Sequence, residues 1–314
     1  MDEAEDICHR LEALDGKLLR ARRRASKAGT KHASWGHPEL SLPQVTRSTC
    51  SAGFYKMLEM SPYLPHSLQR VTCLCEAPGG FAQAITLLHP ECIVSAASMS
   101  CHIEFSPHLP RSCRVWRGNR PPRTKACHSS DIRDASVRMA LVKWRYNQDA
   151  VTADGGTFCH DHDDAEALMF SLMRAQAEVG TTMLRMGGCL LLKFLQGTNP
   201  ATRVLLARLE VSFSSVQVVK PLSSRRWNSE RYVVCRGKRA ELGRSTQQCS
   251  VELLRSLELT AWGQICGLAD KVFLDADGAR QKSQELRERY VALIGAVLPC
   301  SASATSELIS LPGR

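Results

Sequence analysis

A short apolar run, Val71 to Glu76, leads directly into the turn-forming residues Ala77-Pro78-Gly79-Gly80. Apolar runs that end at Gly and Pro predict buried strands, and the pattern from Phe81 to Leu88 predicts a helix directly after the turn. Glycine lets the backbone turn sharply and come close to a ligand, while the first N–H groups of the helix can face a polar group. This strand–turn–helix unit is typical of an open α/β sheet that binds a ligand beyond the carboxyl ends of its strands.

The same alternation of apolar runs and helical patterns continues along the 314 residues. Further strands are predicted at 92–97, 150–153, 189–194, 216–219 and 232–235. Helices are predicted at 2–28, 44–60, 137–145, 165–186, 201–210, 251–259 and 281–298, while 99–127 is expected to be irregular. This order predicts an α/β fold, a Rossmann-like domain whose mostly parallel sheet is sandwiched by helices. We expect a basic helical N-terminal extension at 1–43, this domain at 44–240 and a helical C-terminal extension at 241–314.

The chain carries a formal net charge of +10, and its isoelectric point is about 9.0. A basic balance of this size fits a polyanionic partner, either nucleic acid or a membrane surface, and does not choose between them. No run approaches the roughly 18 apolar residues that a transmembrane helix needs, and the acidic N-terminus does not resemble a signal peptide. We therefore expect an intracellular protein, cytoplasmic or nuclear, with no membrane partner and with its 14 cysteines reduced.

Several short motifs resemble, in the same order, those of the FtsJ-like RNA 2′-O-methyltransferases. The turn from Glu76 to Phe81 is similar to the cofactor-binding loop of that family. The family's other motifs are similar to Ser51 to Glu59, Asp131 to Asp134, Asp149 to Gly156, Leu191 to Phe194 and Lys220 to Val234. The resemblance covers about residues 45–237, and its specificity comes from the order, since each motif alone is weak. The Asp-Gly-Gly and Asn-Ser-Glu-Arg-Tyr segments are most similar to cap-specific and viral members.

The resemblance implies an S-adenosylmethionine-dependent enzyme that methylates a ribose 2′-hydroxyl of RNA, and it favours capped mRNA (cap-1 formation). The residues that match the family's catalytic positions are Lys56, Asp154, Lys193 and Glu230. The implied cofactor-binding residues are Glu76, Pro78, Gly79, Gly80, Phe81, Asp131, Ile132 and Asp154. No metal is required for this chemistry. The alternatives are a ribosomal or transfer RNA 2′-O-methyltransferase and a catalytically inactive RNA-binding homologue. A dinucleotide-dependent oxidoreductase is disfavoured because no G-x-G-x-x-G opens the first helix of the domain.

A ribose hydroxyl is a poor nucleophile until its proton is being removed, so the charge state of a catalytic lysine matters. Lys193 lies in an apolar run, and burial there is expected to lower its pKa. A second cation at Lys56 pushes that pKa further down, whereas Asp154 and Glu230 pull it up and orient the ammonium group. Taken singly, Lys193 could be a strand residue whose amine reaches water, and Asp154 could be a turn residue. The four residues together, in family order, favour catalysis.

One motif departs from the family pattern. Ribosomal members usually carry an acidic residue after the second strand, for the cofactor ribose, but this chain has Ala97-Ser98-Met99-Ser100. Cap-specific members often lack that acid too, so the difference favours the cap interpretation. Ser98 or Ser100 is a candidate replacement, and Gly79, Phe81 and Asp131 are expected to carry more of the cofactor contact.

Basic residues near the carboxyl edge of the sheet are the candidates for RNA contact: Arg225, Arg226, Trp227, Arg123 and Lys125. The indole rings of Trp227 and of Trp116 could stack on bases or anchor the core. The basic end of the first helix could dock on phosphates or remain a solvated tail. The cluster from His160 to Asp164 contains metal-binding side chains, but its position just before a helix favours an ordinary helix start over a metal site.

Overall fold

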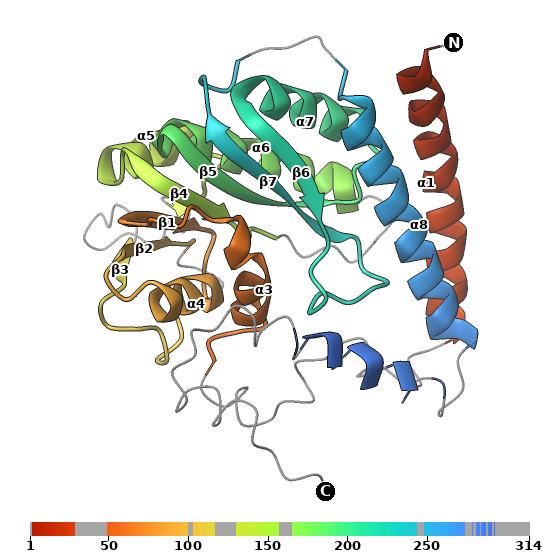
Figure 1. Cartoon of the computed structure of the whole chain (residues 1–314), viewed down its shortest axis with the longest axis horizontal. Helices are drawn as coiled ribbons and strands as arrows, with labels where there is room; N and C mark the ends of the chain where they lie inside the picture. Colours follow the sequence, from red (N-terminus) through yellow and green to blue (C-terminus); the bar gives the residue numbers. More distant parts are fainter. Residues whose placement is uncertain are drawn as a thin grey trace, which may run out of the picture.

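The computed structural model describes residues 2–28, 49–99, 103–116, 130–156, 165–243 and 248–273, together with scattered positions between 278 and 292 (Figure 1). A seven-stranded sheet with the order β3-β2-β1-β4-β5-β7-β6 forms its centre. The strands are β1 (Arg70–Leu74), β2 (Ile93–Ala97), β3 (Arg114–Trp116), β4 (Gln148–Ala153), β5 (Leu184–Leu195), β6 (Phe213–Val219) and β7 (Glu230–Lys238). The expected α/β fold with a mostly parallel sheet is confirmed.

Strand β7 runs antiparallel to both of its neighbours, β5 and β6, whereas the other strand pairs of the sheet are parallel. Because of this reversal, the first residue of β7 lies at the same edge of the sheet as the last residues of the parallel strands. The register places Glu230 opposite Leu195, and Tyr232 opposite Lys193. The carboxyl edge therefore collects residues from β1, β4, β5 and β7, and ligands bind at this edge in open α/β sheets.

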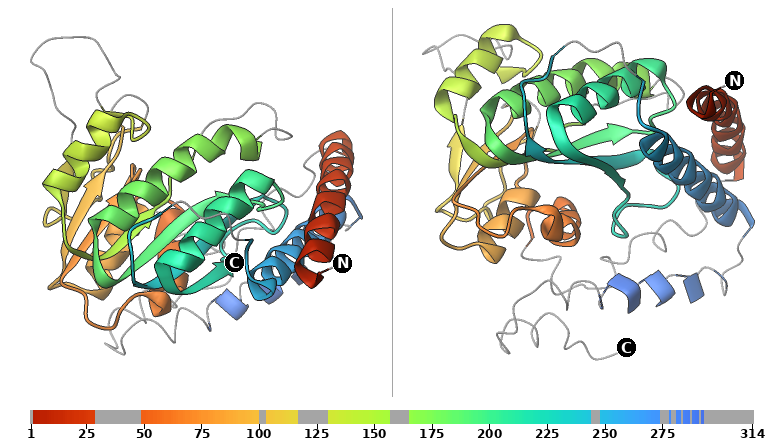
Figure 2. Two further views of the ribbon diagram at one scale, coloured as in Figure 1. Left: turned by 90° about the horizontal axis from the view of Figure 1, so that it is seen from above. Right: turned by 45° about the horizontal axis from the view of Figure 1, so that its top comes forward.

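Helices cover both faces of the sheet (Figure 2). One face is covered by α3 (Gly53–Met60) and α4 (Gly80–Leu88), and the other by α5 (Ala135–Trp144), α6 (Ala165–Met183) and α7 (Pro200–Ser212). The residues of β1 divide between the two sides, since Val71 and Cys73 pack with α3 and α4 whereas Leu74 joins the core under the other helices. Strands that are buried on both faces explain the continuous apolar runs of the sequence.

The two terminal extensions pack against each other beside the sheet edge formed by β6. Helix α1 (Glu3–Ala28) lies alongside α8 (Val251–Phe273), as Figures 1 and 2 show. Ile7, Leu11, Leu14 and Leu18 repeat at helical spacing and are all buried, so α1 presents one apolar stripe to its surroundings. Arg10 Nε also lies 2.7 Å from Oε1 of Glu258 on α8. The N-terminal helix is therefore a packed element and not a solvated tail.

Several elements differ from their predicted bounds, most of all α8, which runs to Phe273 and not only to residue 259. Three of the other differences have a local explanation. In the described chain the helix expected from residue 44 begins at Gly53, whose N–H donates to Ser51 Oγ at 3.1 Å just before the first turn. The helix predicted to reach 186 stops at Met183, and β5 begins at once because Leu184 already pairs with Gln148 across a register shift. Strand β3 falls in the stretch predicted to be irregular, because three residues are too few to give a periodic signal.

Several predictions concern residues outside the described ranges. These are the end of the N-terminal extension and the helix start at 29–48, half of the helix at 281–298, Ser100, Arg123, Lys125 and the cluster 160–164. Within the ranges given above, no helix is both long enough and apolar enough to span a membrane.

Candidate active site

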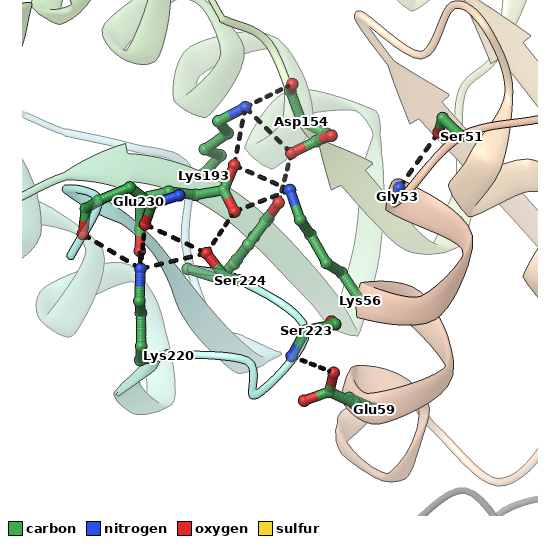
Figure 3. A network of polar contacts seen from close by, with 12 residues as sticks. Ser51, Gly53, Lys56, Glu59, Asp154, Lys193, Lys220, Ser223, Ser224 and Glu230 are labelled. Atoms are coloured by element: carbon green, nitrogen blue, oxygen red, sulfur yellow. Dashed lines mark hydrogen bonds and ion pairs between the residues drawn. The ribbon is translucent and has the colours of Figure 1, made fainter. Parts of the chain in front are cut away.

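Lys56, Asp154, Lys193 and Glu230 come together at the carboxyl edge of the sheet (Figure 3). Lys56 Nζ lies 2.7 Å from Glu230 Oε1 and 2.9 Å from Glu230 Oε2. Lys193 Nζ lies 3.3 Å from Glu230 Oε2 and 3.4 Å from Asp154 Oδ1. Glu230 thus bridges two lysines, and Lys193 bridges two carboxylates. The structure brings together all four residues that were predicted to be catalytic.

Each of the four residues comes from a different element. Helix α3 carries Lys56, Asp154 directly follows β4, Lys193 is near the end of β5, and Glu230 opens β7. The four side chains are only 11 to 21 % exposed. Charges that are this well shielded from water interact more strongly than surface charges do, so the neighbouring charges shift the pKa values of Lys193 and Glu230.

Burial and the neighbouring charges shift the pKa values of this cluster in opposite directions. Burial raises the pKa of Glu230, but Lys56 and Lys193 stabilise its carboxylate and hold the pKa well below its usual range. Burial lowers the pKa of Lys193, but Asp154 and Glu230 stabilise its ammonium form, and the pKa ends above the ordinary lysine value. The expectation that Lys193 has a lowered pKa is therefore wrong, because its two carboxylate neighbours outweigh burial. Lys193 is positively charged at neutral pH in this arrangement.

Three further polar side chains support the four, and sequence reasoning did not single them out. Tyr232 Oη donates to Asp154 Oδ1 at 2.5 Å, and Ser224 Oγ donates to Glu230 Oε1 at 2.8 Å. Lys220 Nζ donates to the backbone carbonyl of Glu230 at 2.7 Å and to Ser224 Oγ at 3.1 Å. All three belong to the last of the family-like motifs, so their place in that motif was the available signal.

Helix α3 also holds the loop between β6 and β7. Glu59, one turn after Lys56, accepts hydrogen bonds from the N–H groups of Leu222 at 2.5 Å and Ser223 at 2.8 Å. Figure 3 shows the contact between Glu59 and Ser223 next to the charged cluster. One helix therefore supplies a lysine to the cluster and anchors the loop that leads to Glu230.

A cavity of about 770 Å³ adjoins the charged cluster, and Asp154 and Lys193 form part of its wall. Its apolar lining includes Leu74, Ala97, Ile103, Trp116, Ile132, Leu141 and Leu172. Its polar lining includes Ser98, Ser130, Asp131 and Arg133. A volume between about 300 and 1,000 Å³ with mostly apolar walls and a few polar groups is typical of a small-molecule site. The cavity and the charged cluster form one continuous site.

The predicted cofactor residues divide into two groups. Asp131, Ile132 and Asp154 line the cavity, and the carboxylate of Asp131 also pairs with Arg133, 2.6 Å between Nη2 and Oδ2. Cys75 and Ala77, which precede Pro78 at the turn, are among the described residues that line the cavity. The turn residues that were predicted to bind cofactor are not part of that wall: Glu76, Pro78, Gly79, Gly80 and Phe81.

The turn residues behind the wall have structural contacts instead. Phe81 is 1 % exposed, and its ring centre lies 5.9 Å from that of Tyr232. Glu76 Oε1 accepts a hydrogen bond from the N–H of Ala82 at 3.0 Å, and burial raises the pKa of Glu76 to about 8. Gly79 has a φ of 116°, a conformation that favours glycine. The motif therefore shapes the turn and the start of α4, and the additional cofactor contact expected of Gly79 and Phe81 stays a prediction.

The predicted RNA-binding residues that the structure describes lie near α8. Arg226 Nη1 pairs with Asp270 Oδ2 at 3.2 Å, Trp227 is half-buried against the main core, and Arg225 is exposed. Trp116 is buried at the cavity wall, where it packs near Trp144, so it is an anchor and not an exposed stacking platform. Over the described ranges, no group of three or more His, Cys, Asp or Glu side chains could hold a metal ion.

Comparisons with known proteins show the family of this chain. The family model described as FtsJ-like methyltransferase matches residues 49–238. The chain is 28 % identical over 173 residues to cap-specific mRNA (nucleoside-2′-O-)-methyltransferase 1 of Trypanosoma brucei brucei, covering 52 % of this chain and 45 % of the relative. The cap-specific mRNA (nucleoside-2′-O-)-methyltransferase of Autographa californica nuclear polyhedrosis virus is 28 % identical over 169 residues, 52 % and 63 % of the two chains.

A tRNA (cytidine(32)/guanosine(34)-2′-O)-methyltransferase of Mus musculus is 36 % identical over 92 residues, which are 28 % of this chain and 27 % of that relative. The chain spans less than two thirds of the length of each of these three relatives.

Proposed function

Because the chain belongs to the FtsJ-like methyltransferase family, we propose that it transfers a methyl group from S-adenosylmethionine to a ribose 2′-hydroxyl of RNA. The observation that carries this proposal is the cluster of Lys56, Asp154, Lys193 and Glu230 at the wall of a cavity of about 770 Å³. Capped mRNA is the proposed substrate, since relatives named as cap-specific come from both a virus and a cell. An intracellular location, cytoplasmic or nuclear, is part of the same proposal.

The residues at the cavity wall suit the proposed cofactor, which when bound supplies a methyl group on a positively charged sulfur. Trp116, Ile132 and Leu141 offer apolar surface to a purine ring, and Asp131 offers a carboxylate for amino or hydroxyl groups. Ser98, which follows β2, is the proposed partner of the cofactor ribose in place of the acid found in ribosomal members.

We propose that Lys193 accepts the proton of the 2′-hydroxyl during the reaction. Its Nζ lies at the cavity wall between the carboxylates of Asp154 and Glu230, which fix its position. The uncharged amine accepts the proton while the hydroxyl oxygen forms its bond to the methyl carbon and the bond from sulfur to that carbon breaks. Lys56 balances part of the negative charge of Glu230, so this carboxylate is shared between the two lysines. Held in this way, the reacting groups need little rearrangement during the reaction.

The raised pKa of Lys193 predicts how the reaction depends on pH. Since Asp154 and Glu230 place that pKa above the ordinary lysine value of 10.5, the uncharged fraction grows about tenfold per pH unit below the pKa. We expect the initial rate at saturating RNA and cofactor to rise steadily between about pH 7 and pH 9. A rate that is constant over this range would contradict proton transfer to Lys193. Thermal unfolding recorded over the same range separates a change in rate from a loss of folded protein.

Methylation of short RNAs of one sequence, with and without a 5′ cap, tests the proposed function. We expect the purified protein to methylate the capped RNA at a 2′-hydroxyl and to leave the uncapped RNA almost unmodified. Equal or better activity on an uncapped transfer RNA would overturn the cap assignment and favour the second candidate, to which the mouse relative points. If the protein binds RNA but methylates none of these RNAs, it is an inactive homologue and the proposed activity is wrong.

A further inference from the structure

Helix α1 lies outside the segment that matches the family, yet it contacts the loops next to the catalytic residues. Asp15 Oδ1 accepts hydrogen bonds from Gln196 Nε2 at 3.1 Å and from Thr198 Oγ1 at 3.0 Å. Arg22 Nη2 donates to the side-chain oxygen of Gln196 and to Ser229 Oγ, the latter at 2.7 Å. One guanidinium group therefore joins the loop after β5 to the loop before β7.

Both loops lead directly to catalytic residues. Gln196 follows Lys193 by three positions, and Ser229 immediately precedes Glu230. The two loops also meet through their backbones, where the N–H of Gln196 donates to the carbonyl of Ser229 at 3.0 Å. Gln196 is 4 % exposed and has a φ of 54°, an unfavourable conformation for a residue with a side chain. Asp15 and Arg22 of α1 both bond to its side chain in this conformation.

The helix that carries Arg22 is itself firmly placed. Leu14 and Leu18 are buried against the main core, and Glu12 Oε1 lies 2.9 Å from Nη2 of Arg203 on α7. Arg22 is half-buried and already has two oxygen partners from the protein. A fixed, partly buried guanidinium that is engaged by neutral oxygens is better suited to hold two loops than to capture an RNA phosphate.

We propose that Arg22 is a positioning residue for methyl transfer, which keeps Lys193 and Glu230 in their relative places through Gln196 and Ser229. This proposal rests on the proposed function of the same site. It extends the working active site of this chain beyond the family segment to its N-terminal helix.

Kinetics of variants of the full chain test this proposal. We expect Arg22→Ala to lower kcat on the order of tenfold, because small displacements of catalytic groups cost rate, while the KM for RNA and its salt dependence stay unchanged. Arg22→Lys should restore part of the loss. The matched control is Arg10→Ala, which removes a contact of α1 to Glu258 but none of the contacts of Arg22 to Gln196 and Ser229, and should leave kcat unchanged. A raised KM for RNA with an unchanged kcat would overturn the proposal and make Arg22 an RNA contact.

Hydrogen exchange gives a readout that does not need activity. We expect the amides of 194–199 and 227–231 to exchange faster in Arg22→Ala and at the wild-type rate in Arg10→Ala. Unchanged exchange in Arg22→Ala would overturn the proposal, whether or not the wild-type protein methylates RNA. A wild-type protein that methylates no RNA would contradict the proposed function but not this role of Arg22. If Arg22→Ala does not fold, Ser229→Ala removes one partner of the same bridge and should show the same changes to a smaller extent.

Discussion

Replacing Lys193 by alanine is expected to reduce methyl transfer by roughly 10²- to 10⁴-fold, the range typical of losing a group that transfers a proton in the reaction. The Lys193 side chain lies between Asp154 and Glu230. Among the ion pairs of the described residues, Lys56 contacts Glu230 but not Asp154, so it does not take the place of Lys193. The measurement is the single-turnover rate with saturating RNA. In a single turnover, slow product release does not hide a slower methyl-transfer step.

Two further variants separate chemistry from structure in this experiment. Lys193→Met keeps most of the apolar stem and removes the amine, so it should be as inactive as the alanine variant. Lys143→Ala on α5 removes a lysine that is not part of the site and should leave the rate unchanged. Binding of S-adenosylmethionine, measured by calorimetry, should persist in all three variants. A single-turnover rate of Lys193→Met within about twofold of the wild-type rate would contradict the proposed role of Lys193.

Replacing Gly80 by alanine is expected to weaken both folding and activity. A Cβ at this position would collide with Ser51 Oγ and would lie 2.6 Å from the backbone nitrogen of Phe54, so α3 and α4 would have to move apart. Overpacking of this kind costs about 1–3 kcal/mol of unfolding free energy. Since α3 carries Lys56, its displacement should also slow methyl transfer, by up to about a hundredfold for a shift near 1 Å. Denaturant unfolding and the single-turnover rate measure the two effects.

Gly263 provides the matched control for this substitution. It also lies in a helix, α8, but a Cβ there would meet no atom within 4 Å. Gly263→Ala should therefore stabilise the protein by about 0.5–1 kcal/mol, as expected when glycine is replaced inside an open helix. If Gly80→Ala had the same stabilising effect, the close contact between α3 and α4 would not limit the fold.

The catalytic cluster was predicted from motifs that resemble those of the FtsJ-like family, and each of its residues stands near the end of a strand or on the helix that precedes the sheet. In an open α/β sheet such positions converge on one edge, so the order of the motifs was sufficient to bring Lys56, Asp154, Lys193 and Glu230 together. The apolar runs identified most of the strands for the same reason, since burial on both faces requires apolar side chains at nearly every position.

Other features depend on distances or directions that a sequence does not contain. The pKa of Lys193 rises instead of falling because two carboxylates lie within 3.4 Å of its amine, and a motif does not specify that spacing. The ring of Phe81 packs near that of Tyr232 and is not part of the cavity wall, although a residue after a glycine-rich turn can face either way. The bridge from Arg22 to Ser229 joins residues far apart in the sequence, and no local pattern predicts such a contact.

The pairing of α1 with α8 has a consequence for the synthesis of the chain. Arg10 and its partner Glu258 are separated by 248 residues, so α1 leaves the ribosome long before α8 exists. At about 5–20 residues per second, this separation corresponds to roughly 12–50 s. During that interval the apolar stripe of Ile7, Leu11, Leu14 and Leu18 lacks its main neighbour and is exposed to unwanted association. Helix α1 can thus reach its final packing only after α8 has been translated, and the stripe of the nascent chain is open to association until then.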